Sequence, residues 1–569
     1  MLTPEYLQNL SNEITSLYDS LNEFTINDIA RRIAKTNSIT DSAAWQINML
    51  QNAGMHRDAV EKEVARLLNE TEAKVYQMFE DAGVTTLEYD DVIYRKAGKN
   101  PVPLYLNKRL MTILTVEASK TFGTFKNLIS TTAKQSEKLF IDTCSAAYLQ
   151  VSSGILDYNS AIRNAVNTIS KKSATVKYPS GHVDKIDVAA RRCILTGVNQ
   201  TAAKVQIEHA FEMGCDLMEI SAHSGARPDH ASWQGKIVSL SGRPGYLSLL
   251  DIGYGEVTGF MGANCRHSWS PYFEGISKPV YTNAQLEEFK NETVTYNDEV
   301  IPKWKAIEKQ RYYERSIRET RRSLSALDGA IKGTADKEAL KKLEQDFTAF
   351  SVKLKKQEAK LKDLCKQTGL LIDNSRVQTY NFGKSVSSKA SAHAQRHYDI
   401  WRKSIGADDT PKTLANYYKM KYNDKKEYEL LQAYIKSVDK GMIKPLTSYS
   451  YYKKIVNEID EKLVGITTSN GIKITGQAKH FAERVIGGER KSQKEIEKHP
   501  ERDWHRKGVS VDEIKDNLQN GYTNGKVDID KLGRESISYT NNICRVSVNP
   551  NTGELIQVNP VSLRKWFYA

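Results

Sequence analysis

Three histidines and one cysteine lie in a glycine-rich stretch in the middle of the chain, residues 221–275. They are His223, His230, Cys265 and His267. Imidazole nitrogen and thiolate sulfur are the donors that zinc prefers, so these four side chains could bind one ion. The spacings H-x6-H and C-x-H, however, match none of the usual zinc patterns, and this argues against a metal site.

The same stretch allows two other interpretations. Arg227, Asp229 and His230 could form a polar cluster for acid–base chemistry. Alternatively, the polar residues could form a hydrogen-bonded network around Trp233 and Trp269 that only holds a compact fold together. The unusual zinc spacing favours this structural network, so we expect neither a metal nor a cofactor. The dense glycines mark tight turns, and they predict a small, turn-rich module rather than helix.

The overall composition bounds what kind of protein can position these residues. The 569 residues are enough for three or more domains, and 40% hydrophobic residues are enough for ordinary cores. The net charge is +13, so polyanions such as packaged DNA would attract the chain, although a lysine-rich solvated surface gives the same charge. No run of 18 apolar residues occurs, so we expect no membrane-spanning helix.

The cysteines and the N-terminal residues indicate the compartment. The six cysteines include no C-x-x-C pair, which argues against a disulfide framework and fits assembly in a reducing cytoplasm. The first residues contain no basic segment followed by an apolar run, so we expect no signal peptide.

Apolar residues recur at helical spacing through most of the first 175 residues. Helices are predicted from Thr3 onward and at residues 25–33, 43–50, 60–79, 104–122 and 136–149. Such apolar stripes usually pack in a helix–helix core, but they could also dock on a partner. A helix at residues 187–209 then leads into the glycine-rich module. Within that module we predict strands at residues 217–221, 236–239 and 267–270.

Residues 282–370 change character, because lysine and arginine rise and glycine becomes rare. Apolar residues keep a 3-4 spacing there, which predicts a helical hairpin or short coiled coil with its turn at residues 329–334. The heptad residues are Leu340, Leu343, Phe347, Phe350, Leu354, Leu361 and Leu364. Residues 302–368 hold 18 basic and 10 acidic side chains, which could follow DNA phosphates. The lack of interleaved aromatic residues favours a solvated helix face instead.

The C-terminal third is predicted to be a connector followed by a second folded unit. The connector has a serine-rich segment at residues 385–391 and helices at residues 392–405 and 413–437. In the unit after it, helices are predicted at residues 472–485 and 510–520, the second opened by a capping box of Ser510 and Glu513. Three alternating runs predict an antiparallel meander, at residues 536–540, 543–549 and 555–559.

Two motifs in the glycine-rich module carry a resemblance to a known family. The segments A-R-P-D-H-A-S-W-Q-G-K and G-A-N-C-R-H-S-W-S-P-Y resemble the tailed-phage minor capsid protein 2 family and, more broadly, the Mu F-like head-morphogenesis module. Residues 178–200 and 213–220 also fit, and the broader similarity runs from the N-terminus to about residue 370. The motif residues are Arg227, Pro228, His230, Gly235, Lys236, Asn264, Cys265, Arg266 and His267.

The resemblance implies a structural minor head protein of a tailed phage. Such a protein is expected in the virion near the portal, with a role in head morphogenesis or in DNA packaging and ejection. Its implied partners are the portal protein and other capsid proteins, and catalysis by the histidines is not implied. The N-C-R-H segment lacks the second cysteine of the C-R-C form found in some relatives, which argues further against a metal.

Residues 466–569 resemble nucleases of the Barnase–EndoU–colicin E5/D–RelE-like fold, in the variety found at the tails of phage head proteins and polymorphic toxins. The matching segments are G-Q-A-K-H-F-A-E-R-V, R-K-G-V-S-V-D-E-I, G-R-E-S-I-S-Y and V-N-P-N-T-G-E-L-I-Q-V-N-P-V-S. The resemblance implies a metal-independent ribonuclease toxin domain, with RNA as substrate and an immunity protein as partner. Because Val561 stands where threonine is often expected, an inactive, RNA-binding domain on a DNA-binding scaffold is one alternative. A toxin effector delivered with the virion is the other.

The implied reaction assigns roles to individual residues. Metal-independent RNA cleavage needs a base for the 2′-hydroxyl proton, an acid for the leaving group and cations for the phosphate. His480 is the expected base or acid, because imidazole titrates near neutral pH, although it could instead cap a local hydrogen-bond network. The other expected residues are His505 as a competing acid or base, Lys507 with Arg506 or Arg534 at the phosphate, and Tyr539 and Ser562 as hydrogen-bond donors.

Together these patterns predict a multidomain, mainly α-helical protein with two small α+β parts. The C-terminal α+β part is expected to hold an antiparallel sheet. The expected parts are a helical portal-docking region (1–175), a Mu F-like module (176–281), a basic helical hairpin or coiled coil (282–370), a connector with helices (371–465) and a nuclease-like domain (466–569).

Overall fold

The structure of the protein is a computed structural model, and the chain divides into two compact units. The structure describes residues 2–3, 6, 12–35, 42–172, 175–178, 181–379, 382–407, 410–443, 447–489, 505–530 and 533–561. Unit 1 is Met1–His393 and unit 2 is Ala394–Ala569. The chain is mainly helical, as predicted. Across the described ranges, no helix has the length and the apolar character that crossing a bilayer requires.

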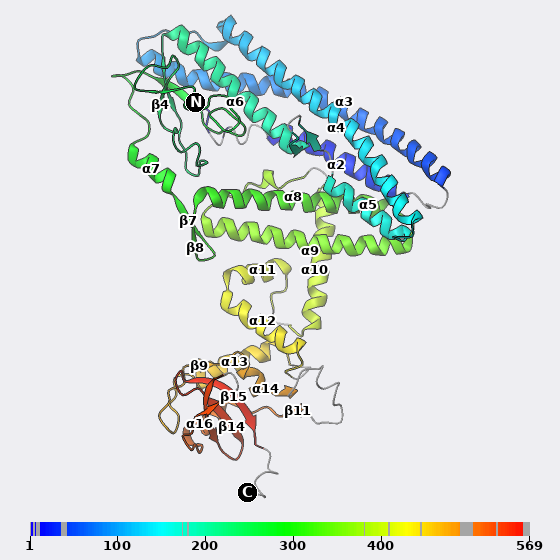
Figure 1. The fold of residues 1–569 in the computed structure, drawn as a ribbon, viewed down its shortest axis with the longest axis vertical. Coiled ribbons are helices and arrows are strands. Elements are labelled where there is room, and N and C mark those ends of the chain that lie inside the picture. The colour runs from blue at the N-terminus through cyan, green and yellow to red at the C-terminus, as the bar shows by residue number, and fades with distance from the viewer. Residues whose placement is uncertain are drawn as a thin grey trace. The chain divides into compact units, whose positions relative to one another are not determined.

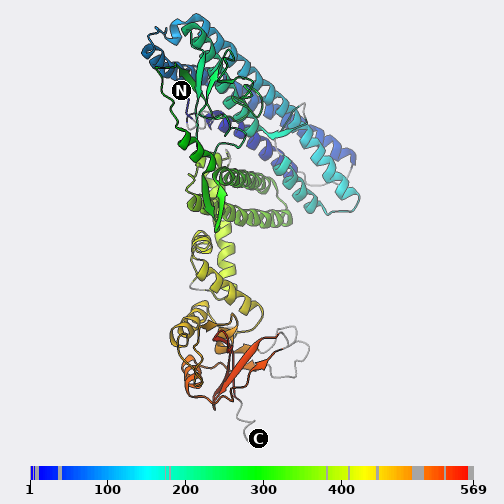
Figure 2. The ribbon, with the colours of Figure 1, turned by 60° about the vertical axis from the view of Figure 1, so that its left-hand side comes forward.

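Three long helices of unit 1 lie side by side (Figures 1 and 2). They are α3 (Ser42–Lys96), α4 (Lys108–Ser152) and α6 (Ile186–Met213). The two helices predicted at residues 104–122 and 136–149 are one continuous helix, α4, which begins where the side chain of Asn107 caps it. One end of α4 packs against α3 and α6 through Phe125, and the other joins a second core through Phe140.

The remaining elements before the glycine-rich module are shorter. Helix α2 (Asn12–Lys35) contains the predicted helix at residues 25–33, and α3 contains the two predicted at residues 43–50 and 60–79. Leu104–Leu106 forms the 3-10 turn η1, and α5 (Tyr158–Lys172) precedes a hairpin of β1 (Thr175–Lys177) and β2 (Val183–Lys185). The helix start predicted at Thr3 lies mostly outside the described residues, although the backbone N–H of Tyr6 donates to the Thr3 hydroxyl, as a cap would.

The glycine-rich module is built on a four-stranded sheet with the order β5-β4-β3-β6. Strand β3 (Leu217–Ile220) pairs antiparallel with β4 (Ile237–Ser239) and with β6 (Trp269–Tyr272), and β5 (Leu247–Ser248) runs parallel to β4. The three predicted strands are therefore confirmed, with β6 beginning two residues later than expected. Trp233 and Trp269 are both buried in the core beneath this sheet.

The predicted helical hairpin is present, but its turn lies elsewhere. Helix α8 (Lys303–Gly333) and helix α9 (Lys337–Thr368) pack side by side (Figure 1), and most of the predicted heptad residues are buried. The turn predicted at residues 329–334 is wrong, since α8 continues to Gly333. A Cβ at Gly329 would lie 3.0 Å from the Asn27 side chain of α2, so this glycine permits close helix packing rather than a turn. Helix α7 (Asn283–Asn291) and the hairpin of β7 (Thr293–Tyr296) and β8 (Glu299–Pro302) precede α8.

Helices from the predicted connector belong to the core of unit 2. After the turn η2 (Asn374–Arg376), helix α10 (Lys384–Ser404) contains the whole serine-rich segment, and α11 (Leu414–Asn423), α12 (Lys425–Asp439) and α13 (Tyr449–Lys462) follow. Tyr434 of α12 and Tyr452 of α13 share one hydrophobic cluster with Phe481 and Val546. The C-terminal sheet therefore folds together with α12 and α13, and unit 2 begins well before residue 466.

Unit 2 contains a five-stranded sheet with the order β12-β13-β14-β15-β9. The predicted meander is confirmed as β13 (Glu535–Thr540), β14 (Cys544–Val548) and β15 (Glu554–Pro560), with β12 (Asp528–Ile529) at one edge. The capping box of Ser510 and Glu513 is also confirmed, at the start of α16 (Val511–Asn520).

The helix predicted at residues 472–485 is largely wrong. Only α14 (Phe481–Ile486) is helical, because β9 (Gly476–Gln477) pairs in parallel with β15 and closes the sheet at its other edge. A short antiparallel pair of β10 (Gly488–Glu489) and β11 (His505–Arg506) follows α14. The residues between these two strands, which include His499 and Trp504, lie outside the described residues.

Candidate functional sites

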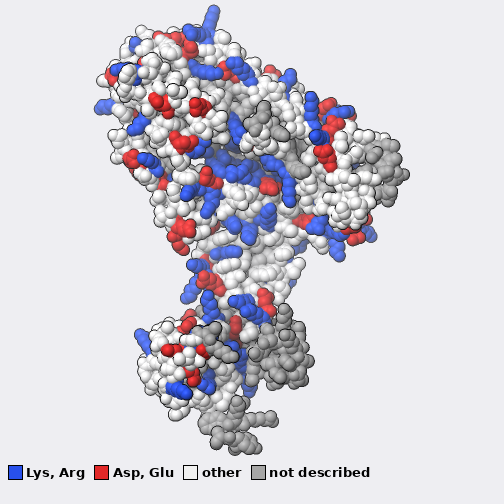
Figure 3. Space-filling model, in the orientation of Figure 1, with Lys and Arg blue, Asp and Glu red and all other residues white. Residues whose placement is uncertain are grey.

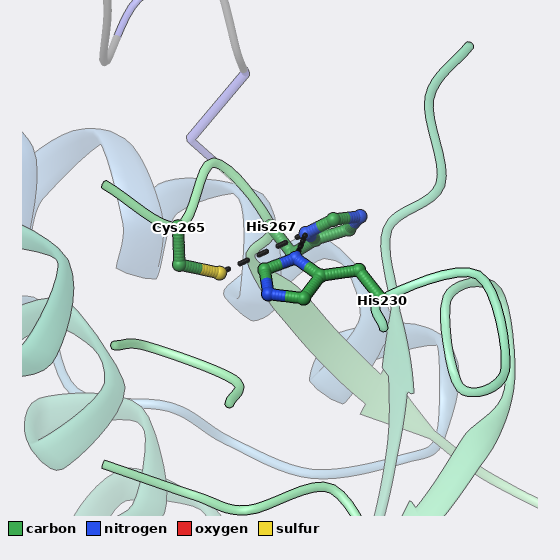
Figure 4. A group of neighbouring side chains, drawn as sticks. All are labelled: His230, Cys265 and His267. Atoms are coloured by element: carbon green, nitrogen blue, oxygen red, sulfur yellow. Dashed lines mark hydrogen bonds between the residues drawn. The ribbon is translucent and has the colours of Figure 1, made fainter. Parts of the chain in front are cut away.

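The polar cluster of the glycine-rich module brings His230, Cys265 and His267 together (Figure 4). His230 lies in the turns between β3 and β4, and the other two lie in the extended segment that leads into β6. Alternate residues of an extended segment point to the same side, so the C-x-H spacing directs both side chains toward His230. Asn264 begins this segment in a left-handed conformation, with φ of 59°.

The donor atoms of these three buried side chains face one another. His230 Nδ1 lies 3.3 Å from His267 Nδ1, and Cys265 Sγ lies 3.7 Å from the same His267 nitrogen. All three donor atoms lie within 4.8 Å of one another. The ring of His223 stacks on that of His267, with 4.6 Å between the ring centroids, so the predicted group of four residues does come together.

The outward-facing nitrogens of the two buried histidines have polar partners. His267 Nε2 lies 3.3 Å from Gln234 Oε1, an oxygen that also accepts from the His223 backbone N–H. His267 therefore carries its proton on Nε2, and Nδ1 presents a lone pair to the cluster. His230 Nε2 lies 2.9 Å from the Thr258 carbonyl oxygen and 2.6 Å from Arg227 Nη2. Nε2 of His230 can thus either donate to the carbonyl or accept from the guanidinium.

Burial keeps the cluster uncharged. It lowers the pKa of His230 to about 4 and the pKa of His267 well below its usual value of 6.5. Burial likewise raises the pKa of the Cys265 thiol. Neutral imidazoles fit a hydrogen-bonded network or a set of metal ligands better than they fit a pair of proton-transfer groups, because neither histidine becomes protonated near neutral pH.

The histidine cluster borders a strongly basic cavity of about 1030 Å³ within unit 1. Its cationic lining residues are Lys74, Arg191, Arg227, Arg266, Arg311, Arg315, Arg318 and Arg376. The only acidic lining residues among those the structure describes are Asp19 and Glu314. Figure 3 shows the corresponding concentration of lysine and arginine in the middle of unit 1. Hereafter this cavity is called the basic cavity.

Both carboxylates of the basic cavity are already paired. Asp19 accepts from Arg322 at 2.8 Å, and Glu314 accepts from Arg311 and Arg376 at 2.9 and 2.8 Å. Burial, together with the neighbouring Arg311, lowers the pKa of Arg376. Among the lining residues that the structure describes, eight cations stand against two carboxylates, and this excess of positive charge makes the cavity suitable for an anion.

Of these eight cations, the sequence analysis named only Arg227 and Arg266. Arg311, Arg315 and Arg318 lie on one face of α8 because they are spaced by four and three residues, and this spacing was the available signal. The structure places this part of the predicted basic arm against the glycine-rich module rather than on a fully solvated face.

A second candidate site in unit 2 is centred on His480, which is the N-cap residue of α14. Burial lowers the pKa of His480, and the nearby cations Arg484 and Arg534 lower it further against the opposing effect of Glu483 and Glu554. His480 and Arg534, both named from the sequence, therefore lie within electrostatic reach of each other. Arg484, which the sequence analysis missed, is four residues from His480 along the chain.

The other residues expected at this site are distributed differently. Tyr539 is fully buried, and its hydroxyl lies 2.5 Å from the Asn470 side-chain oxygen and 3.1 Å from the hydroxyl of the buried Thr468, so it does not present a donor to a substrate. Lys507 is exposed just after β11, whereas Arg506 is buried. His505 is in β11 opposite Glu489. The side chain of His505 and the whole of Ser562 lie outside the described residues.

Comparison with known proteins places most of unit 1 in one family. Residues 2–366 match the family model described as phage minor capsid protein 2. Over 245 residues, the chain is 26% identical to a protein described as "Structural protein" of Lactococcus phage LL-H, covering 40% of this chain and 63% of that protein. Over 75 residues, it is 36% identical to a "Structural protein" of Lactococcus phage mv4, covering 13% of this chain and 52% of that protein. Each match thus spans less than two thirds of the relative's length. No solved structure matches the chain.

Proposed function

Because this chain belongs to the phage minor capsid protein 2 family and is therefore a phage structural protein, we propose that it is a minor component of the virion head at the portal vertex, where it acts in head morphogenesis or in DNA packaging and ejection. The observation that carries this proposal is the family match, which covers nearly all of unit 1. Its partners are then the portal protein and other capsid proteins, and assembly takes place in the host cytoplasm.

Cross-linking in purified heads tests the proposed position. We expect lysines of α3, α4 or α9 to be linked to the portal protein, with a few copies of the chain per particle. Heads that lack the chain, or that link it only to the major capsid lattice, would contradict a place at the portal. A matched sample of tails separated from heads controls for carry-over.

The basic cavity supports contact with packaged DNA. Its arginines and lysine outnumber the carboxylates, and phosphate is the anion that such a protein meets in a filled head. Binding through phosphate contacts releases counterions, so the affinity should fall steeply with salt concentration and depend little on sequence.

Replacing Lys74, Arg191 and Arg315 with glutamine is expected to weaken DNA binding by the full chain. These residues reach the cavity from α3, α6 and α8. Loss of three phosphate contacts should reduce the slope of log affinity against log salt concentration by about three. Fluorescence anisotropy with labelled DNA at several salt concentrations measures this slope.

The control removes the same charge from another surface. Lys341, Lys356 and Lys362 are exposed on α9 and do not line the basic cavity. If their replacement with glutamine lowers the slope as much as the cavity variant does, DNA contacts the general surface and not the cavity.

A second candidate function is metal-independent ribonuclease activity in unit 2. The observation that favours it is the position of His480 at the start of α14, where the cations Arg484 and Arg534 help to lower the pKa of the imidazole and could stabilise the charge of a phosphate. An RNA substrate and an immunity protein that blocks the site belong to this proposal. In this arrangement the head protein delivers the toxin domain.

The nuclease proposal is tested with the fragment Ala394–Ala569, which keeps the shared core of α12, α13 and the sheet. The fragment is incubated with total RNA and with plasmid DNA in the presence of EDTA. Cleavage of RNA supports the proposal. Cleavage of DNA alone assigns a different nuclease class, and no cleavage of either leaves a structural protein whose unit 2 binds without cutting.

A further inference from the structure

We propose that His230, Cys265 and His267 bind a zinc ion in the glycine-rich module. This inference is independent of the proposed position in the virion and of the proposed ribonuclease activity. It concerns the three side chains drawn in Figure 4.

The separations between the donor atoms fit a tetrahedral zinc ion. Zinc binds imidazole nitrogen at about 2.0–2.1 Å and thiolate sulfur at about 2.3 Å. Tetrahedral angles then place two nitrogens about 3.4 Å apart and a nitrogen and a sulfur about 3.6 Å apart. The observed separations are 3.3 Å between the two Nδ1 atoms and 3.7 Å between Cys265 Sγ and His267 Nδ1.

The outer partners of the histidines orient their lone pairs toward one point. Metal-binding histidines usually donate their other ring N–H to a carbonyl or a comparable acceptor. His267 Nε2 faces Gln234 Oε1, and His230 Nε2 faces both the Thr258 carbonyl and Arg227 Nη2. When His230 Nε2 donates to the Thr258 carbonyl, both Nδ1 atoms present lone pairs to the ion.

A metal-free arrangement of the same atoms leaves one conflict. Arg227 would donate to His230 Nε2, and His230 Nδ1–H would donate to His267 Nδ1. The Cys265 thiol, however, points at the same His267 nitrogen, which has a single lone pair in the ring plane. Two donors would then compete for one acceptor inside a buried cluster, whereas one cation satisfies both histidines and the thiolate together.

The ion would join two segments that are distant in sequence. His230 lies before β4, and Cys265 and His267 lie 35 and 37 positions further along, before β6. These three side chains hold the ion, and the fourth tetrahedral position is left to a further donor such as water. The module is rich in turns, so a cross-link between these two segments stabilises it where regular secondary structure is short.

Metal analysis of the full chain tests the site. Protein purified without chelators is expected to contain about one zinc ion per chain, measured by inductively coupled plasma mass spectrometry. The Cys265→Ser substitution should reduce that zinc content about tenfold or more. Replacement of zinc by cobalt should give the absorption of a tetrahedral thiolate complex, and the near-ultraviolet sulfur-to-cobalt band should be absent in Cys265→Ser.

The matched control is Cys215→Ser, because Cys215 is a buried cysteine of the same module and donates to the Leu217 carbonyl outside the cluster. This variant should keep its zinc and its cobalt spectrum. Circular dichroism shows whether each variant is folded, and a chelator should lower the melting temperature of the wild-type chain without needing any substitution. The proposal is overturned if wild-type protein neither contains zinc nor takes up zinc or cobalt on titration. It is also overturned if Cys215→Ser loses as much metal as Cys265→Ser.

Discussion

Replacement of His480 with alanine is expected to lower the rate of RNA cleavage by the Ala394–Ala569 fragment by about 10²–10⁴-fold, if unit 2 is the proposed ribonuclease. That is the usual contribution of a positioned general base or acid. His480 is the candidate because it is half-buried at the start of α14 and lies within electrostatic reach of Arg484 and Arg534. Initial rates on a short fluorogenic RNA in EDTA measure the effect.

The pH dependence of the same rate separates a base from a bystander. Burial and the neighbouring Arg484 hold the pKa of His480 below its ordinary value of 6.5. The neutral imidazole that accepts a proton is therefore present at neutral pH, and activity should fall only as the pH drops through that lowered pKa. Arg484→Gln removes one cause of the shift, so the acid limb should move toward higher pH.

The control for His480 is the exposed neighbour Lys479, whose replacement with alanine should leave the rate within about twofold. An active fragment in which His480→Ala also stays within this range would exclude His480 as the catalytic group. In that case His505, the competing acid or base named from the sequence, is the histidine to test next.

The elements that could be predicted are those specified by neighbouring residues. The capping box at Ser510, the meander of unit 2 and three strands of the central sheet depend on local alternation and turn chemistry. The secondary-structure predictions were wrong where contacts with distant parts of the chain determine the local structure. Gly329 stays in α8 because it lies against Asn27 of α2, and Gly476 is in a strand because β15 pairs with it.

The same distinction applies to the sites. The histidine and cysteine cluster could be named because its members lie in one glycine-rich stretch. The basic cavity could not, because six of its eight cations come from α3, α6, α8 and the segment around Arg376, and only Arg227 and Arg266 lie in the glycine-rich stretch. Likewise, a tyrosine such as Tyr539 could donate a hydrogen bond to a substrate. Its position in strand β13, however, directs its hydroxyl toward the buried Thr468.

A buried ion pair between α2 and α8 gives the largest expected effect on stability. Arg322 of α8 donates to Asp19 of α2 at 2.8 Å, and the two side chains are 5% and 7% exposed. Replacing Arg322 with methionine keeps much of the side-chain volume but removes the cation that contacts the buried Asp19 carboxylate at 2.8 Å. We expect unit 1 to lose about 3–5 kcal/mol of unfolding free energy, measured by urea denaturation followed by circular dichroism.

Two further variants show whether this loss comes from the buried charge. Arg66→Met removes a pair with Glu63 and Glu70 whose arginine is 42% exposed, and it should change stability by only about 0–1 kcal/mol. Adding Asp19→Leu to Arg322→Met removes the buried carboxylate, so the double variant should regain much of the lost stability. If it does not, the loss came from packing between α2 and α8, where Gly329 already brings the two helices close together.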